Sequence, residues 1–169
     1  MTTATIDIVP YVAEYIRGKY WDARYGAVHF PAGSDIYVTL YDLMERRPKS
    51  AGVDRGNLTL CLPERREANK ACGKSPETYN WFSGESVKIL ERRMKVMMWA
   101  ELHDTLDEAK HLRGIKFVES VYVFMRRYDL QSITEDALLK NYQRWRDAQR
   151  RTVKRGYKKS NSRGRKKPT

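Results

Sequence analysis

The sequence predicts a mainly α-helical protein with a minor two-stranded β element. Apolar residues recur at helical spacing over most of the chain, most clearly over residues 76–113 and 115–128. One segment, residues 57–63, alternates leucine with Thr59 and Cys61 and ends in proline, which is typical of a strand. An apolar share of 41% in 169 residues is enough for one folded body with a proper core.

The first 75 residues are expected to form a small α+β lobe. Pro10 is tolerated in the first turn of a helix, Ser34 is a suitable N-cap, and Pro48 is expected to end the helix that Ser34 begins. The two strands are expected to pair, with a helix covering one face, because two strands alone are marginal. The predicted elements are a helix over 8–20, a strand over 27–31, a helix over 34–47 and a strand over 57–63.

Residues 76–156 are expected to form a helical domain. Gly114 separates its first two helices, and Thr134 is expected to cap the third. The middle helix is apolar on most sides, so we expect it to be the central, buried helix. The predicted elements are helices over 76–113, 115–128 and 134–155, followed by a disordered basic tail over residues 157–169.

The net charge of +12 lies entirely in the last thirty residues. From Lys140 to Thr169 there are 13 basic side chains and one acidic side chain, Asp147. Residues 1–139 hold 20 basic and 20 acidic side chains and sum to zero. A neutral body with a concentrated cationic end is typical of a protein that binds a polyanion, and nucleic acid is the polyanion we expect.

Other classes of function find little support in the residue pattern. No run of apolar residues is long enough to span a membrane, and the N-terminus lacks the pattern of a secretion signal, so a cytoplasmic protein, in the bacterial cytosol or on the nucleoid, is expected. Cys61 and Cys72 are expected to be reduced thiols.

A possible metal-binding face was considered and set aside. Glu101, Asp104, Glu108 and His111 share one helical face and include one Glu-x-x-His pair, but a carboxylate-bridged site needs a second such pair. With Lys110 and Arg113 nearby, a solvated ladder of ion pairs is expected there. No glycine-rich phosphate loop or nucleophile elbow is present. The chain is therefore expected to be no enzyme and to hold no metal or cofactor.

Residues 115–155 contain a short helix, a short connection and a second helix with a cationic face. This arrangement resembles helix-turn-helix DNA-binding domains in a general way, which implies duplex DNA as the partner. Such domains commonly present the start of the second helix to the bases, but here Glu135 and Asp136 lie at that start and would repel phosphates. We therefore expect contact through the middle and end of the helix and through the tail. The candidate phosphate contacts are Lys140, Arg144, Arg146, Arg150, Arg151, Lys154, Arg155, Lys158, Lys159, Arg163, Arg165, Lys166 and Lys167, and the candidate base readers are Asn141 and Gln143.

The leading hypothesis is a non-enzymatic DNA-binding regulator or accessory factor. Small basic proteins of this style are common on phages and mobile elements. An alternative is a structural protein of a virion or ribonucleoprotein, whose basic tail contacts packaged nucleic acid. RNA binding, with Tyr142 and Trp145 stacking on bases, is a third hypothesis. Protein partners or further copies of the chain are left open, and no membrane partner is expected.

Overall fold

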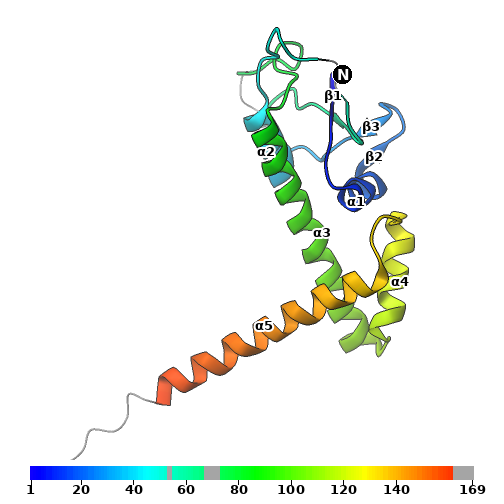
Figure 1. Cartoon of the computed structure of the whole chain (residues 1–169), viewed down its shortest axis with the longest axis vertical. Helices are drawn as coiled ribbons and strands as arrows, with labels where there is room; N and C mark the ends of the chain where they lie inside the picture. The colour runs from blue at the N-terminus through cyan, green and yellow to red at the C-terminus, as the bar shows by residue number, and fades with distance from the viewer. Residues whose placement is uncertain (53–54, 67–72, 162–169) are drawn as a thin grey trace, which may run out of the picture.

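The computed structural model describes residues 1–52, 55–66 and 73–161, with side chains to residue 152. This part of the chain contains five helices and one four-stranded sheet. The long helix α3 (Gly84–Arg113) forms the axis of the molecule (Figure 1). The sheet, α1 (Pro10–Tyr20) and α2 (Asp35–Leu43) gather around its first half, and α4 (Phe117–Tyr128) and α5 (Glu135–Asn161) pack at its other end. The mainly helical fold class is thus confirmed.

The sheet has four strands rather than the two expected from the sequence. Its strand order is β1-β4-β3-β2, in which β4 pairs antiparallel with β1 and parallel with β3. The expected pairing of residues 28–30 with the leucine strand is therefore confirmed, at Val28 and Leu60. The two added strands are β1 at the N-terminus, which pairs with β4, and β2, a two-residue arm of the hairpin with β3. The strands are β1 (Thr3–Ile6), β2 (Trp21–Asp22), β3 (Ala27–Val28) and β4 (Leu58–Cys61).

Helix α2 begins as expected and ends early. The Ser34 hydroxyl accepts a hydrogen bond from the Tyr37 N–H at 3.3 Å, which confirms the predicted cap. The helix ends at Leu43, well before Pro48. The chain turns extended there because Glu45 forms an antiparallel bridge with Trp81, so pairing with a distant segment overrides the local helical pattern.

Helix α3 is shorter at its start than predicted. Residues 76–83 are not helical, and the Ser83 side chain caps the first turn by accepting from the Ser86 N–H at 3.3 Å. Gly114 ends the helix as expected, at a φ of 67° that a side chain would strain. The buried stripe of α3 includes Leu90, Met94 and Met98 with no measurable exposure.

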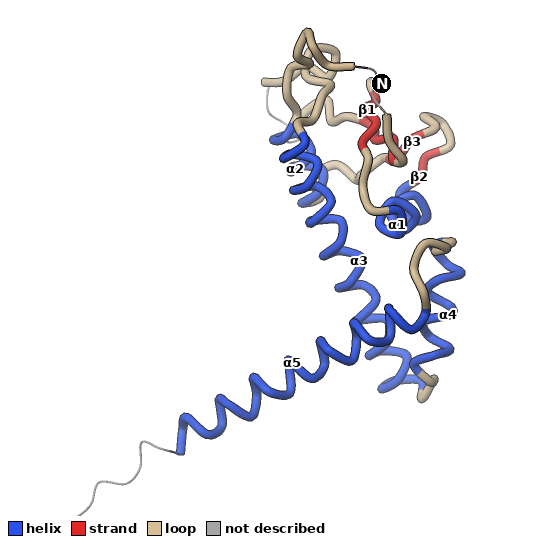
Figure 2. Tube along the Cα trace, in the orientation of Figure 1, coloured by secondary structure: helices blue, strands red, loops and turns tan. Residues whose placement is uncertain are grey.

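Helix α4 is not the central helix that its apolar sequence predicted. Val121 and Phe124 are buried, but Val118, Tyr122 and Val123 are 51%, 56% and 63% exposed. The central position belongs to α3, which contacts elements at both ends of the molecule, while α4 lies at the edge (Figure 2). The outward face of α4 therefore exposes apolar side chains to solvent.

Buried side chains form one continuous core from Ala4 in the sheet to Tyr142 in α5. Helix α5 runs on to Asn161, past the boundary expected at Gly156, and residues 162–169 of the predicted tail lie outside the described residues. None of the helices described is both long enough and apolar enough to cross a membrane.

Candidate nucleic-acid interface

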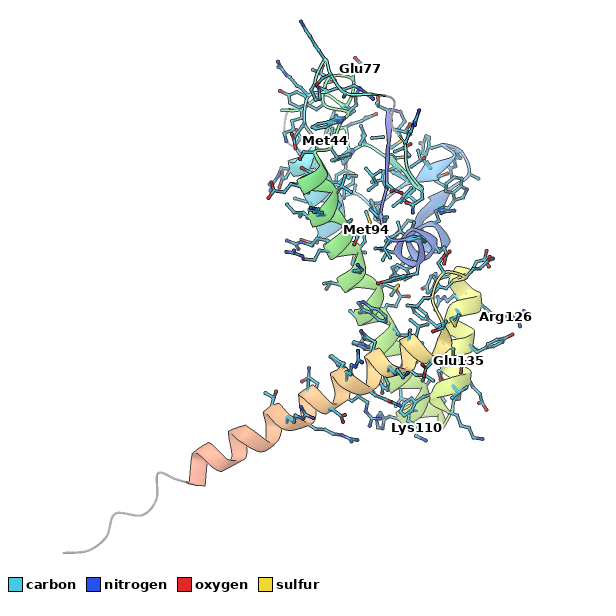
Figure 3. All side chains as sticks on the ribbon, in the orientation of Figure 1. Met44, Glu77, Met94, Lys110, Arg126 and Glu135 are labelled. Carbon is cyan, nitrogen blue, oxygen red and sulfur yellow. The ribbon has the colours of Figure 1, made fainter. Side chains whose placement is uncertain are left out.

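The first third of α5 anchors the helix to the body. Leu138 and Tyr142 are buried, at 0% and 1% exposed, because their one-turn spacing places both on the side facing α3 and α4. The Tyr142 ring packs against Phe117 with centroids 5.0 Å apart, and its hydroxyl donates to Asp107 Oδ1. Figure 3 shows this region, near the labelled Glu135 and Lys110, filled with side chains from three helices.

An aromatic stack continues the anchor by one turn. The His103 ring lies on Trp145 with centroids 4.5 Å apart and planes 22° apart, and Trp99 stacks beyond His103. His103 Nε2 and Asn141 Oδ1 lie 3.0 Å apart in a hydrogen bond, so the imidazole N–H donates. Asn141, proposed from the sequence as a base reader, thus faces α3. Its amide oxygen is engaged by the body of the protein.

Beyond Trp145 the helix leaves the body. In Figure 1, α5 continues as a straight rod away from every other element. Residues 147–152 are all exposed. Residues 147–161 correspond to a helix about 22 Å long at the usual rise per residue. We call this projecting part, residues 147–161, the arm.

The basic side chains of α5 that the structure describes differ in their exposure and in their ion pairing. Arg144, Arg150 and Arg151 are exposed and form no ion pair with the described part of the chain. Lys140 pairs with Asp136 at 2.6 Å, but both side chains are more than half exposed, so solvent screens the pair. Arg146 is half-buried, with its guanidinium 5.2 Å from the centre of the Phe117 ring.

Helical geometry places the free cations on one side. At 3.6 residues per turn, Arg144 and Arg151 lie near the middle of the side opposite Leu138 and Tyr142, and Arg150 lies toward one edge of that side. Gln143 is exposed beside them. The acidic Asp147 lies on the same side, is exposed, and pairs with none of these arginines among the described contacts.

The remaining sequence candidates fall into two groups. The helical backbone of the arm includes Lys154, Arg155, Lys158 and Lys159. Four further candidates, Arg163, Arg165, Lys166 and Lys167, lie outside the described residues.

The acidic face of α3 was expected to form only solvent-exposed ion pairs, and the structure differs at Glu101. Glu108 does pair with Arg113 at 2.9 Å on the surface. Glu101 instead turns toward α1 and α4, where Tyr15 Oη donates to Oε2 at 2.6 Å, Tyr128 Oη donates to Oε1, and Lys19 Nζ contacts Oε2. This group, which we call the Glu101 cluster, joins three helices.

The pKa values of the Glu101 cluster follow from this arrangement. Burial acts to raise the pKa of Glu101, but hydrogen bonds from Lys19, Tyr128 and Tyr15 outweigh it, and the pKa is lowered. Burial, helped by the Glu101 carboxylate, raises the pKa of Tyr128 to about 12 and raises that of Tyr15 further. The cluster holds a carboxylate and neutral phenols at ordinary pH, so its chemistry is that of a structural clamp.

Metal-binding and thiol chemistry were also considered. Among the residues with described positions, no three His, Cys, Asp or Glu side chains come together in a way that could hold a metal ion. Cys61 is buried in β4, and burial raises the pKa of its thiol. Cys72 lies outside the described residues.

Comparison with protein-family models, with curated proteins and with solved structures gives no match to this chain.

Proposed function

We propose that this protein is a non-enzymatic nucleic-acid-binding protein that grips duplex DNA through α5. The observation that carries the proposal is the anchored helix whose projecting arm bears exposed, unpaired arginines on a body of zero net charge. Arg144, Arg150 and Arg151 are the principal phosphate contacts, and the basic residues that follow them add sequence-independent affinity. The cytoplasm is the expected compartment, and an accessory factor of a phage or mobile element is the kind of role proposed.

The shape of α5 favours duplex DNA over single strands. A lone α-helix fits the major groove, and the arm can lie there without other elements in the way. Single-strand and RNA binding rely on free aromatic rings, whereas Tyr142 is buried and Trp145 is already stacked on His103. The α4–α5 pair serves as a helix-turn-helix variant in this proposal, with contact moved from the start of the second helix to its middle and end.

Gln143 is the base reader that the proposal retains. It is exposed beside Arg144, whereas the Asn141 amide oxygen is bonded to His103. A glutamine in the major groove can make two hydrogen bonds to adenine. Its replacement by alanine should therefore relax preference for one base pair without changing the salt dependence of binding.

The test measures affinity for duplex DNA against salt concentration. If about six phosphates are neutralised, affinity falls on the order of a thousandfold between 50 and 200 mM salt. The combined variant Arg144→Gln, Arg150→Gln and Arg151→Gln should lower the slope of log affinity against log salt by about three units. Truncation after Gln149 should remove most of the remaining affinity while keeping the anchor.

A matched control removes three exposed, unpaired charges from the body. These are Arg17, Lys88 and Arg92, each changed to Gln. This variant has the same net charge as the α5 variant, so a general effect of protein charge would weaken both equally. Equal salt slopes for the two triple variants would refute binding through α5. Tighter binding to RNA or single strands than to duplex DNA would refute the choice of duplex.

A further inference from the structure

The outward face of α4 has no partner in the described structure, although it has an apolar middle with one opposite charge toward each end. Tyr122 and Val123 are 56% and 63% exposed at its middle. Glu119 and Arg126 are exposed on the line opposite the buried Phe124, since each lies about half a helical turn from it. Figure 3 shows the labelled Arg126 on the outer side of α4, away from α3 and α5.

The order of charges along this face is self-complementary. The midpoint between Tyr122 and Val123 is equally far from Glu119 on one side and Arg126 on the other. If a second copy of α4 packs antiparallel about a two-fold axis at that midpoint, Glu119 of each copy faces Arg126 of the other. The same axis brings each Tyr122 against its equivalent on one flank and each Val123 against its equivalent on the other.

The surroundings of Glu119, Arg126 and Val123 favour such packing. Glu119 makes no ion pair or side-chain hydrogen bond with the described residues, so its charge is available. The Arg126 guanidinium lies 6.0 Å from the Tyr122 ring centre, which holds it over the face. Beside Val123 is a pocket of about 240 Å³, lined by apolar side chains such as Ile115 and by charged ones such as Arg127, that makes this flank concave.

We propose that the protein self-associates into a two-fold symmetric dimer through the outward face of α4. The apolar middle supplies the burial that drives association, and the two Glu119–Arg126 pairs fix the antiparallel register. Helix α5 runs away from this face on the far side of α3 (Figure 1), so each copy keeps its arm free. A dimer would carry two arms, but the proposal stands whether or not those arms bind nucleic acid.

The test is sedimentation velocity on the full chain, freed of nucleic acid, over a wide range of protein concentration. The wild-type protein should show a species of twice the 19.9 kDa chain mass. Val123→Asp should abolish that species, because it buries an unpaired charge at the interface. The matched control is Val96→Asp, since Val96 is an exposed valine, at 62%, on α3 and outside the proposed face. This control should still form the dimer.

Charge reversal separates this interface from any other. Glu119→Arg alone, or Arg126→Glu alone, sets two pairs of like charges face to face and should weaken the dimer by about tenfold or more. The two reversals combined restore two opposite pairs and should recover most of the affinity. A wild-type chain that is monomeric throughout overturns the proposal. So does a dimer that withstands Val123→Asp, or a combined reversal as weak as the single ones.

Discussion

Replacing Glu101 with alanine should be among the most damaging single changes in this chain. Its carboxylate accepts from the hydroxyls of Tyr15 and Tyr128, which are 0% and 4% exposed, and also contacts Lys19. Alanine leaves both hydroxyl protons without an acceptor in the interior. An orphaned buried donor costs about 1–3 kcal/mol, so two of them cost about 2–6 kcal/mol.

The matched control for this prediction is Asp104→Ala, since Asp104 is exposed one turn further along the same face of α3 and has no described partner. It should change the free energy of unfolding by no more than about 0.5 kcal/mol. Urea unfolding at neutral pH, followed by far-ultraviolet circular dichroism, measures both variants. A Glu101→Ala protein as stable as the Asp104→Ala protein would refute the clamp.

The pH dependence of the clamp has a definite sign. The folded state lowers the pKa of Glu101, so the unfolded state binds its proton more readily. The stability that Glu101 contributes is therefore complete above the pKa of an unfolded glutamate and is lost as pH falls through the folded value. The difference in unfolding free energy between wild type and Glu101→Gln should shrink on acidification. A difference that grows instead would contradict the assigned direction.

Two further predictions concern other contacts of the body. Gly18→Ala should destabilise the fold by about 1–3 kcal/mol in thermal or urea unfolding, because the added Cβ would lie 2.9 Å from the Tyr128 backbone. Gly84→Ala, at an open helix start, should be neutral or stabilising. Tyr142→Phe should cost about 1–2 kcal/mol at neutral pH through the lost bond to Asp107. Burial raises the pKa of Tyr142 from 10.0 to about 12, so its contribution is present below pH 10 and that difference should shrink as pH rises through 12.

Much of the fold could be predicted because its signals are local. The Ser34 cap, the stop at Gly114 and the leucine strand all follow from short stretches of sequence, and the structure confirms each. The early end of α2 could not be predicted, because it depends on a bridge between Glu45 and Trp81, far apart in the chain. Local pattern therefore predicts a boundary that a cap or a glycine sets, but not one that is set by pairing with a distant segment.

The candidate sites show the same division between local and tertiary information. The concentration of charge after Lys140 is visible in composition alone. Its separation into an anchor and an arm is not, because Trp145 packs on His103 only when α3 and α5 cross. Glu101 resembled its exposed neighbours on α3 in sequence, and only the folded position of α1 brings Tyr15 to it. Helical periodicity places a residue on a face but does not say what covers that face.

The division of α5 into an anchor and an arm is consistent with the proposed function. Near the body, Leu138 and Tyr142 stabilise the helix by burial. The arm has no such support, and its Arg150 and Lys154 lie one turn apart in the helix, where like charges repel. Isolated helices of about 12–15 residues are marginal in water, so the arm gains most from a ligand that neutralises its arginines. In the proposed function, a phosphate backbone would supply that neutralisation at the end of the molecule where packing supplies least, so anchoring and polyanion binding would be complementary roles of one helix.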